Sequence, residues 1–279
     1  MSENGSTNGS TPDEPERLRL GGMALRNGLL IHGPKTWAVA ARTRDGRIEV
    51  ASGPKPTLAR GRLGTTPLLR GPLRLAEAMA VLPLARGTLR SARLPFEDGV
   101  VVGATLASLA LSGLLRRRGA ATVGRELAIA ALGTVPALAA LRDPALASYH
   151  AVEHKAIGGY EQGRDPEEVP KEHERCGSNL IGPMMVFSVA GQVLTEKFAP
   201  DAGPVTRALA AVSGIGAAVE LFAYAERHPD SALGKAVHGP GYEIQRRVST
   251  REPTAEQLEV GVAALDEVLR AEDAAADRT

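Results

Sequence analysis

Aromatic residues, cysteine and an excess of charge of either sign are all scarce in this chain of 279 residues. Aromatic side chains make up only 3% of it, which leaves few platforms on which nucleic-acid bases could stack. The formal net charge is +1, so no bulk attraction to nucleic acid is implied, and we predict no nucleic-acid partner. The single cysteine excludes an internal disulfide and fits a reducing compartment.

The N-terminal region also lacks the apolar run of a signal peptide, and we expect none. Residues 1–17 are polar and rich in Ser, Gly, Asn, Thr and Pro, a composition typical of a disordered tail. Farther on, Trp37–Arg42 has the composition of a strand, and Asp45-Gly46 separates it from a second short run. Asp-Gly between two such runs is typical of a hairpin. A small β unit is therefore predicted within residues 18–95.

A first helical pattern ends this segment, between Leu73 and Leu94. Leu75, Met79 and Leu82 recur at helical spacing, so we expect them to form one apolar stripe. Pro83 lies inside the pattern and is expected to kink the helix, because proline cannot donate the backbone hydrogen bond of a helix interior.

A second helical pattern lies in the last segment, residues 227–279. Thr254 precedes an acidic first turn, as a helix N-cap does, and apolar residues then recur at helical spacing from Leu258 to Leu269. The pattern predicts a C-terminal helix. The charged residues from Glu272 to Thr279 are expected to fray.

Four apolar stretches lie between these two patterns. A membrane-spanning helix needs about 20 apolar residues, with a range of roughly 17 to 25, and most of the stretches are at or below that length. They are rich in small residues, which is typical of closely packed membrane helices and equally of soluble Ala-rich bundles. Hydropathy alone leaves both alternatives open. The stretches are Val100–Leu115, Leu127–Leu141, Leu180–Leu194 and Ala208–Ala225.

A cluster of metal-ligand residue types lies between the second and third stretches, in residues 142–179. His150 and His154 are four residues apart, which on a helix places both imidazoles on one face. Glu153 completes an H-x-x-E-H pattern, the inverted zinc-hydrolase motif. His173 and Cys176 then supply a further nitrogen and a sulfur. This mixture favours Zn²⁺, with Fe²⁺ as the alternative.

Two ligand sets are open at this point. In the closed set, both motif histidines, His173 and Cys176 hold a four-coordinate structural zinc. In the open set, three protein ligands leave one position for water; Glu161 can be the third ligand, and Glu153 is the catalytic general base. Lys155 and Arg175 are candidates for binding an anionic group of a substrate, or for pairing with neighbouring acids.

Several blocks of residues carry a family likeness, of which the central block around the histidines is the most specific. They include Gly21-Gly22, Gly33-Pro34-Lys35, Tyr149-His150, Glu153-His154-Lys155, Tyr160-Glu161, His173, Arg175-Cys176-Gly177, Pro240-Gly241 and Glu252-Pro253. In these blocks, over about residues 20–270, the chain resembles DUF1385, the YqhQ-like family of bacterial membrane proteins, which has no assigned reaction. The resemblance implies a polytopic membrane protein and a metal-dependent activity. Met23 and Asn27 depart from the family pattern of Gln and Glu.

The predicted fold is mainly α: a polytopic membrane bundle of about four short apolar helices, residues 96–226, with the small N-terminal β unit and the C-terminal helix. The predicted function is that of a metal-dependent, hydrolytic membrane enzyme. A membrane scaffold or assembly factor with a structural zinc is the alternative, and a transporter, suggested by Glu220 in an apolar stretch, is weaker. We expect a multi-pass protein of the cell membrane whose motif loop faces the reducing cytoplasm, with lipid and unidentified proteins as partners.

Overall fold

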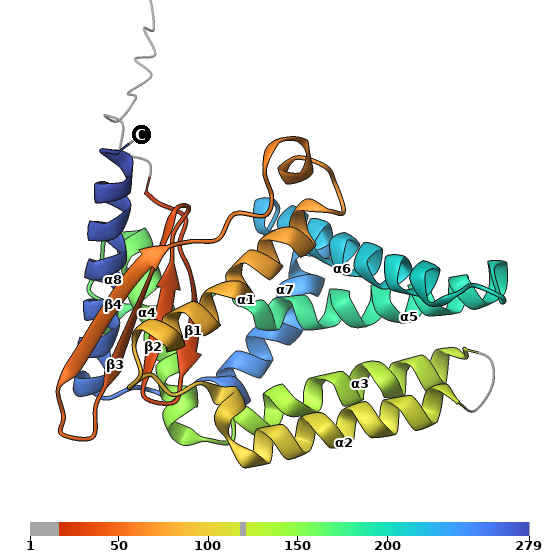
Figure 1. The fold of residues 1–279 in the computed structure, drawn as a ribbon, viewed down its shortest axis with the longest axis horizontal. Coiled ribbons are helices and arrows are strands. Elements are labelled where there is room, and N and C mark those ends of the chain that lie inside the picture. Colours follow the sequence, from red (N-terminus) through yellow and green to blue (C-terminus); the bar gives the residue numbers. More distant parts are fainter. Residues whose placement is uncertain (1–16, 118–120, 279) are drawn as a thin grey trace, which may run out of the picture.

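The computed structural model describes residues 17–117 and 121–278. The predicted disordered tail lies outside the described residues, except for Arg17. The described chain is mainly helical, with a four-stranded sheet near its N-terminus and a helix at its C-terminal end, which confirms the predicted fold class (Figure 1). The strands are β1 Gly21–Leu25, β2 Gly28–His32, β3 Thr36–Arg42 and β4 Ile48–Pro54; the helices are α1 Arg70–Thr88, α2 Gly99–Arg116, α3 Val123–Ala140, α4 Pro144–Gln162, α5 Ile181–Phe198, α6 Pro204–Arg227, α7 Ala232–Ile244 and α8 Ala255–Ala276.

The sheet is an antiparallel meander in which each strand pairs with the next along the chain. The predicted hairpin is confirmed: β3 and β4 flank Asp45-Gly46. Gly46 has φ of +87°, a conformation that glycine adopts without the steric cost that a Cβ would add.

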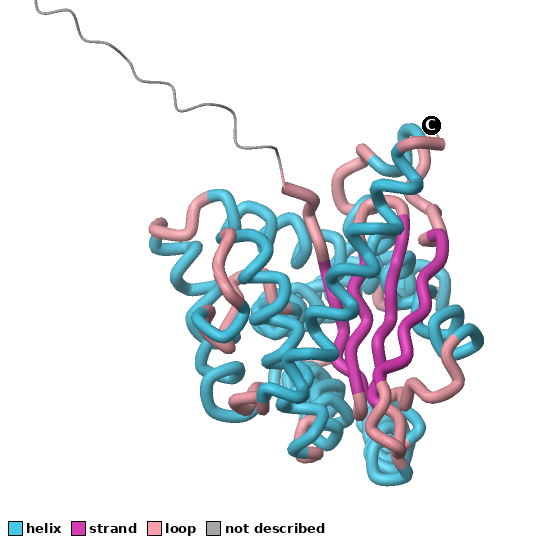
Figure 2. Tube along the Cα trace, turned by 90° about the vertical axis from the view of Figure 1, so that its left-hand side faces the viewer, coloured by secondary structure: helices cyan, strands magenta, loops and turns pink. Residues whose placement is uncertain are grey.

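One face of the sheet packs against α4 and α8. Figure 2 shows a helix lying across the strands, and this is α8, whose C-terminal end is marked. At the crossing of α4 and α8, a Cβ on Gly261 would lie 2.5 Å from Cγ1 of Val152, so the two backbones approach as closely as glycine permits. The sheet, α4 and α8, which belong to three different predicted segments, share one core. Its members include Leu29, Ile31, Ala38, Ala40, Tyr149, Val152, Ile157, Val260, Ala264 and Val268.

The other face of the sheet packs against α1, and of the predicted stripe only Leu82 contributes to this contact. Leu75 and Met79 are 39% and 42% exposed, whereas Val81, Leu82 and Ala85 are buried against β2 and β3. Only the C-terminal half of α1 reaches the sheet. Its N-terminal half packs against α6, so a single stripe along the helix cannot describe its burial.

Glu220, the acid within the last apolar stretch, has a partner. Its carboxylate forms a bidentate ion pair with Arg70 at the start of α1, with 2.7 Å between Arg70 Nε and Glu220 Oε1. A paired guanidinium stabilises a carboxylate in apolar surroundings. The acid that suggested a transporter therefore connects α1 to α6.

The apolar helices form two hairpins, α2–α3 and α5–α6, that extend side by side away from the sheet (Figure 1). Four helices of the described chain are long and apolar enough to cross a membrane. Only 11% of α2 and 11% of α3 is buried, and Val100, Leu106 and Leu109 are each more than 60% exposed. An apolar surface of this extent is rare on a soluble protein. The four helices therefore indicate association with a membrane.

The end of the chain is ordered through Ala276, so the predicted fraying from Glu272 is wrong for the described residues. Glu272 is 5% exposed, and its Oε1 accepts hydrogen bonds from Lys35 N, Thr36 N and Thr36 Oγ1 at 2.8, 2.6 and 2.9 Å. The charged residue anchors α8 to the turn between β2 and β3. Sequence pattern could not reveal this contact, because the partners are more than 230 residues apart.

Glu272→Ala should destabilise the protein by about 1–3 kcal/mol, because buried backbone donors lose their acceptor. Thermal unfolding of the purified protein in detergent measures the change. Asp273→Ala is the matched control, since Asp273 is the exposed neighbour on the same helix. Equal unfolding temperatures for the two variants would contradict the anchoring role.

Washing isolated membranes with alkaline carbonate should leave the protein in the membrane fraction, because an exposed apolar surface on four helices requires lipid around it. Immunoblotting of the pellet and supernatant measures the partition. A peripheral protein of the same cells serves as the release control. Release of this chain together with that control would mean that the apolar helices do not span.

Candidate metal centre

The H-x-x-E-H motif lies on α4, as its spacing predicts. Asp143 caps the helix by accepting a hydrogen bond from Ala145 N, and Gly163 ends it in the left-handed conformation with φ of +65°. His150 and His154 lie one turn apart, with ring centroids separated by 4.4 Å. Because α4 packs against the sheet and against α8 through Tyr149, Val152 and Ile157, the core fixes the helix that carries both rings.

Cys176 comes from the segment that follows α4, and the fully buried Gln245 holds this segment in place. Gln245 Oε1 accepts a hydrogen bond from His173 N at 2.7 Å, and Gln245 Nε2 donates to Ser178 Oγ at 2.9 Å. Both contacts flank the cysteine. The sequence contained no pattern that marks Gln245 as the residue that positions the thiol.

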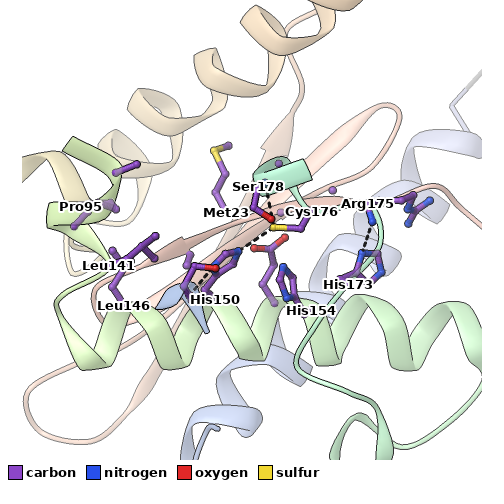
Figure 3. Close-up of a pocket in the computed structure, with 18 of the residues that line it drawn as sticks. Met23, Pro95, Leu141, Leu146, His150, His154, His173, Arg175, Cys176 and Ser178 are labelled. Carbon is purple, nitrogen blue, oxygen red and sulfur yellow. Dashed lines mark hydrogen bonds between the residues drawn. The ribbon is translucent and has the colours of Figure 1, made fainter. Parts of the chain in front are cut away.

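Three donor atoms converge in the cluster formed by His150, His154 and Cys176. These atoms lie within 4.8 Å of one another, and Cys176 Sγ is 3.4 Å from His150 Nε2. Figure 3 shows both rings directed from α4 toward the sulfur. We call this group the His–His–Cys cluster.

Backbone carbonyls orient both rings of the cluster. His150 Nδ1 is 2.8 Å from the carbonyl oxygen of Ser249, and His154 Nδ1 is 2.6 Å from that of Lys171. Since a carbonyl only accepts, each Nδ1 carries the proton, and each Nε2 keeps its lone pair. His154 Nε2 is buried without a hydrogen-bond partner. An Nδ1–H bonded to a carbonyl with Nε2 free is the usual arrangement of a metal-ligating histidine.

A π-helical turn, Gln245–Ser249, supplies one of these carbonyls. It lies between α7 and α8 and directs Ser249 O at His150. Such turns are rare and often occur at functional sites. Neither Ser249 nor Lys171 could be identified from sequence, because backbone carbonyls leave no residue-type signal.

The electrostatics of the cluster suit a cation. Burial lowers the pKa of His154 well below its ordinary value, which keeps the imidazole neutral as a ligand must be. Burial, with a contribution from the charge of Glu153, raises the pKa of Cys176 to about 11. Burial also raises the pKa of Glu153. A divalent cation favours the thiolate and carboxylate that burial disfavours, so the donor set fits a metal ion.

His173 and Glu161 lie beside the cluster rather than in it. The centroid of the His173 ring is 5.7 Å from that of His154, and His173 Nε2 is 3.1 Å from Glu161 Oε2. Arg175 donates its backbone N–H to His173 Nδ1 at 3.2 Å and pairs through its guanidinium with Glu161. Both ring nitrogens of His173 are therefore engaged. The structure assembles neither the closed set nor an open set containing Glu161.

Glu153 faces the cluster from the same helix. It is half-buried, and among the described residues no hydrogen-bond donor engages its carboxylate. Its side chain lies against the backbone of β1, where a Cβ on Gly22 would be 2.6 Å from Glu153 Cγ. Glycine at this position therefore makes room for the carboxylate.

The two candidate substrate-binding cations lie in different surroundings. Lys155 is 4% exposed; its Nζ donates to Val169 O at 2.8 Å and pairs with Glu252 at 2.8 Å, so it fixes the segment after α4. Arg175 lines the cavity beside the cluster.

This cavity has a volume of about 570 Å³ and runs from the His–His–Cys cluster to the C-terminal end of α3 and the start of α5. Glu153, Arg175 and Ser178 supply polar groups to the lining, and most of the other lining residues are apolar. Figure 3 shows Arg175 and Ser178 near Cys176. A pocket of this size with a few convergent polar groups is typical of a small-molecule site. Its apolar wall includes Met23, Leu138, Leu141, Leu146, Ile157 and Ile181.

Comparison with known families gives one match, which covers residues 143–271 and is described as "Protein of unknown function (DUF1385)". Over this region the chain is similar to the DUF1385 family. The DUF1385 region begins at the N-cap of α4 and ends within α8, so it includes the whole His–His–Cys cluster and Glu153. The expected likeness of the N-terminal block, at Gly21-Gly22, lies outside the matched residues. No curated protein and no solved structure matches the chain.

His154→Ala should remove most of the bound metal, because a two-donor remnant binds an ion far more weakly than three donors do. His173→Ala should retain it, because both ring nitrogens of His173 have other partners. Metal content per chain of the purified proteins, by elemental analysis, measures both. His228→Ala is the control at an exposed histidine. If His154→Ala and His173→Ala lose the same amount of metal, His173 is a ligand and the closed four-ligand set is correct.

Proposed function

We propose that this protein is a metal-dependent membrane enzyme of the hydrolase class, with His150, His154 and Cys176 as the ligands of the ion. The observation that carries the proposal is a three-donor cluster beside an unpaired carboxylate in one cavity. Nitrogen and sulfur donors favour zinc, with iron as the alternative. Three protein ligands are typical of catalytic zinc, whereas structural zinc sites are closed by four.

Glu153 is the proposed general base. Its carboxylate is free of hydrogen-bond donors among the described residues, so it can accept a proton from a water molecule in the cavity. Burial raises the pKa of Glu153 above the ordinary value of a carboxyl group, which makes the carboxylate a stronger base. Gly22 leaves the space that this side chain needs. A bound zinc ion supplies Lewis-acid polarisation of the scissile group.

The rest of the cavity defines the kind of substrate. Arg175 provides a cation next to the cluster, suited to a carboxylate or phosphate, and its pairing with Glu161 holds the guanidinium in position. The apolar wall from β1, α3 and α4 suits a substrate with an apolar portion. Amphiphilic molecules at a membrane surface combine both features.

A scaffold with a structural zinc is the second candidate. The burial of His154 and Cys176, and the network through which Gln245 holds the cysteine segment, are features of an ion that stabilises a fold. In this alternative the cavity and Glu153 have no chemical role.

We further propose that the protein is a multi-pass protein of the cell membrane, with the sheet and the His–His–Cys cluster on the cytoplasmic side. The free thiol of Cys176 suits the reducing cytoplasm. The four apolar helices support lipid as the surrounding partner.

Glu153→Gln separates the two candidates, because it keeps the size of the side chain and removes the base. We expect the variant to keep its metal and its thermal stability while losing cellular function, since a general base contributes about 10²–10⁴ in rate. Complementation of a deletion strain, beside the metal content, measures this.

The control for that experiment is Glu256→Gln, at an exposed glutamate on α8, which should complement fully. Cys176→Ser is made in parallel. A fully functional Glu153→Gln beside an unstable Cys176→Ser would favour the structural zinc and reject the enzyme.

A further inference from the structure

A second cavity, at the end of the sheet where the β1–β2 turn and the β3–β4 hairpin turn lie, is lined by arginine. Its volume is about 650 Å³, and three separate segments form it: the β1–β2 turn, the β3–β4 hairpin and the loop that follows α1. We call it the arginine pocket. It lies apart from the His–His–Cys cluster and shares no lining residue with the metal cavity. The arginine pocket is lined by Arg26, Asn27, Arg42, Thr43, Arg44, Arg86, Arg90, Ser91, Arg93 and Glu97.

Half of the arginines in the pocket are neutralised by acids. Arg26 pairs with Asp98 and Asp143, at 3.2 and 3.0 Å. In the same way, Arg42 pairs with Glu259 at 2.8 Å, and Arg86 pairs with Glu97 at 2.7 Å.

The other half carry charge without a partner. Arg44, Arg90 and Arg93 are exposed, and within the described part of the chain no acid forms an ion pair with any of them. The whole chain has a net charge of only +1, so three unpaired guanidinium groups around one concavity are a local excess. Like charges in close proximity repel, and a bound anion relieves that repulsion.

Hydrogen bonds to Asn27 fix the three walls relative to one another. Its Nδ2 donates to Arg42 O and to Ser91 O, each at 2.9 Å, and its Oδ1 accepts from Arg93 N at 2.9 Å. The backbone N–H of Arg26 donates to Arg93 O at 3.0 Å. The arginines therefore project from a backbone that is already assembled, which lowers the entropic cost of binding.

The position of the pocket links it to the membrane surface. Glu97 on its wall is two residues before α2, the first of the apolar helices, and the neighbouring side chains Phe96 and Val100 are 55% and 68% exposed. The pocket therefore lies beside the N-terminal end of α2, a candidate membrane span, where we expect lipid headgroups. Guanidinium groups bind phosphate oxygens through paired hydrogen bonds.

We propose that the arginine pocket binds a phosphate-bearing anion through Arg44, Arg90 and Arg93. The phosphate belongs either to the headgroup of an anionic phospholipid or to a soluble phosphate. The inference is independent of the metal centre, because it concerns different residues and a different cavity.

The test uses the full-length protein and two probes. The first probe is inorganic phosphate, titrated into protein in a neutral detergent. The second is lipid: the protein is placed in nanodiscs of phosphatidylcholine alone or mixed equally with phosphatidylglycerol, and bound lipid is identified by native mass spectrometry after release. Binding of the first probe identifies a soluble phosphate, and selective retention of phosphatidylglycerol identifies a headgroup.

The variants are Arg90→Ala/Arg93→Ala in the pocket and Arg60→Ala/Arg62→Ala as the control, which removes the same charge from two exposed arginines outside it. The pocket variant should weaken the binding of whichever probe binds by about tenfold or more, as expected for the loss of charge-assisted contacts. The control should change it less than twofold.

Arg90→Lys/Arg93→Lys keeps the charge and removes the guanidinium fork, and it should also weaken binding. This variant serves if the double alanine variant does not fold. Two results would overturn the proposal: equal effects of the pocket and control variants, or wild-type protein that binds no phosphate and retains both lipids equally.

Discussion

The packing of α4 against the sheet and against α8 on the same face is the constraint on which the rest of the structure depends. At this crossing a glycine on α8 makes room for Val152, and His150 and His154 precede and follow Val152 by two residues on α4. The core therefore sets the separation of the two imidazoles before any ion binds. A ligand pair that is fixed by packing binds an ion without the entropic cost of ordering it.

The second half of the His–His–Cys cluster depends on polar contacts instead. Gln245 bonds to His173 N and Ser178 Oγ on either side of Cys176, and one backbone carbonyl oxygen sets the tautomer of each histidine. Buried polar networks of this kind are sensitive to the loss of any one member. Packing determines where the imidazoles lie, and the network determines which atoms they present.

Local sequence patterns predicted the features that depend on residues close together in the chain, such as turns and helices. Asp45-Gly46 predicted the hairpin, four apolar stretches predicted four helices, and the i, i+4 histidines predicted two rings on one helical face. The choice between His173 and Cys176 was not predictable, because it depends on the side-chain contacts of Glu161 and Arg175. Burial of Glu272 was equally hidden, since its partners in the β2–β3 turn are distant in sequence.

The carbonyl that orients His150 belongs to Ser249, which follows the last of the four apolar helices in the chain. During synthesis the ribosome therefore releases every apolar helix before it releases the residue that completes the orientation of the ring. The helix α8, which covers the sheet and α4, is made later still. The order of synthesis thus places the apolar helices ahead of completion of the cluster, and a chain that stops short of α8 lacks the helix against which α4 and the sheet pack.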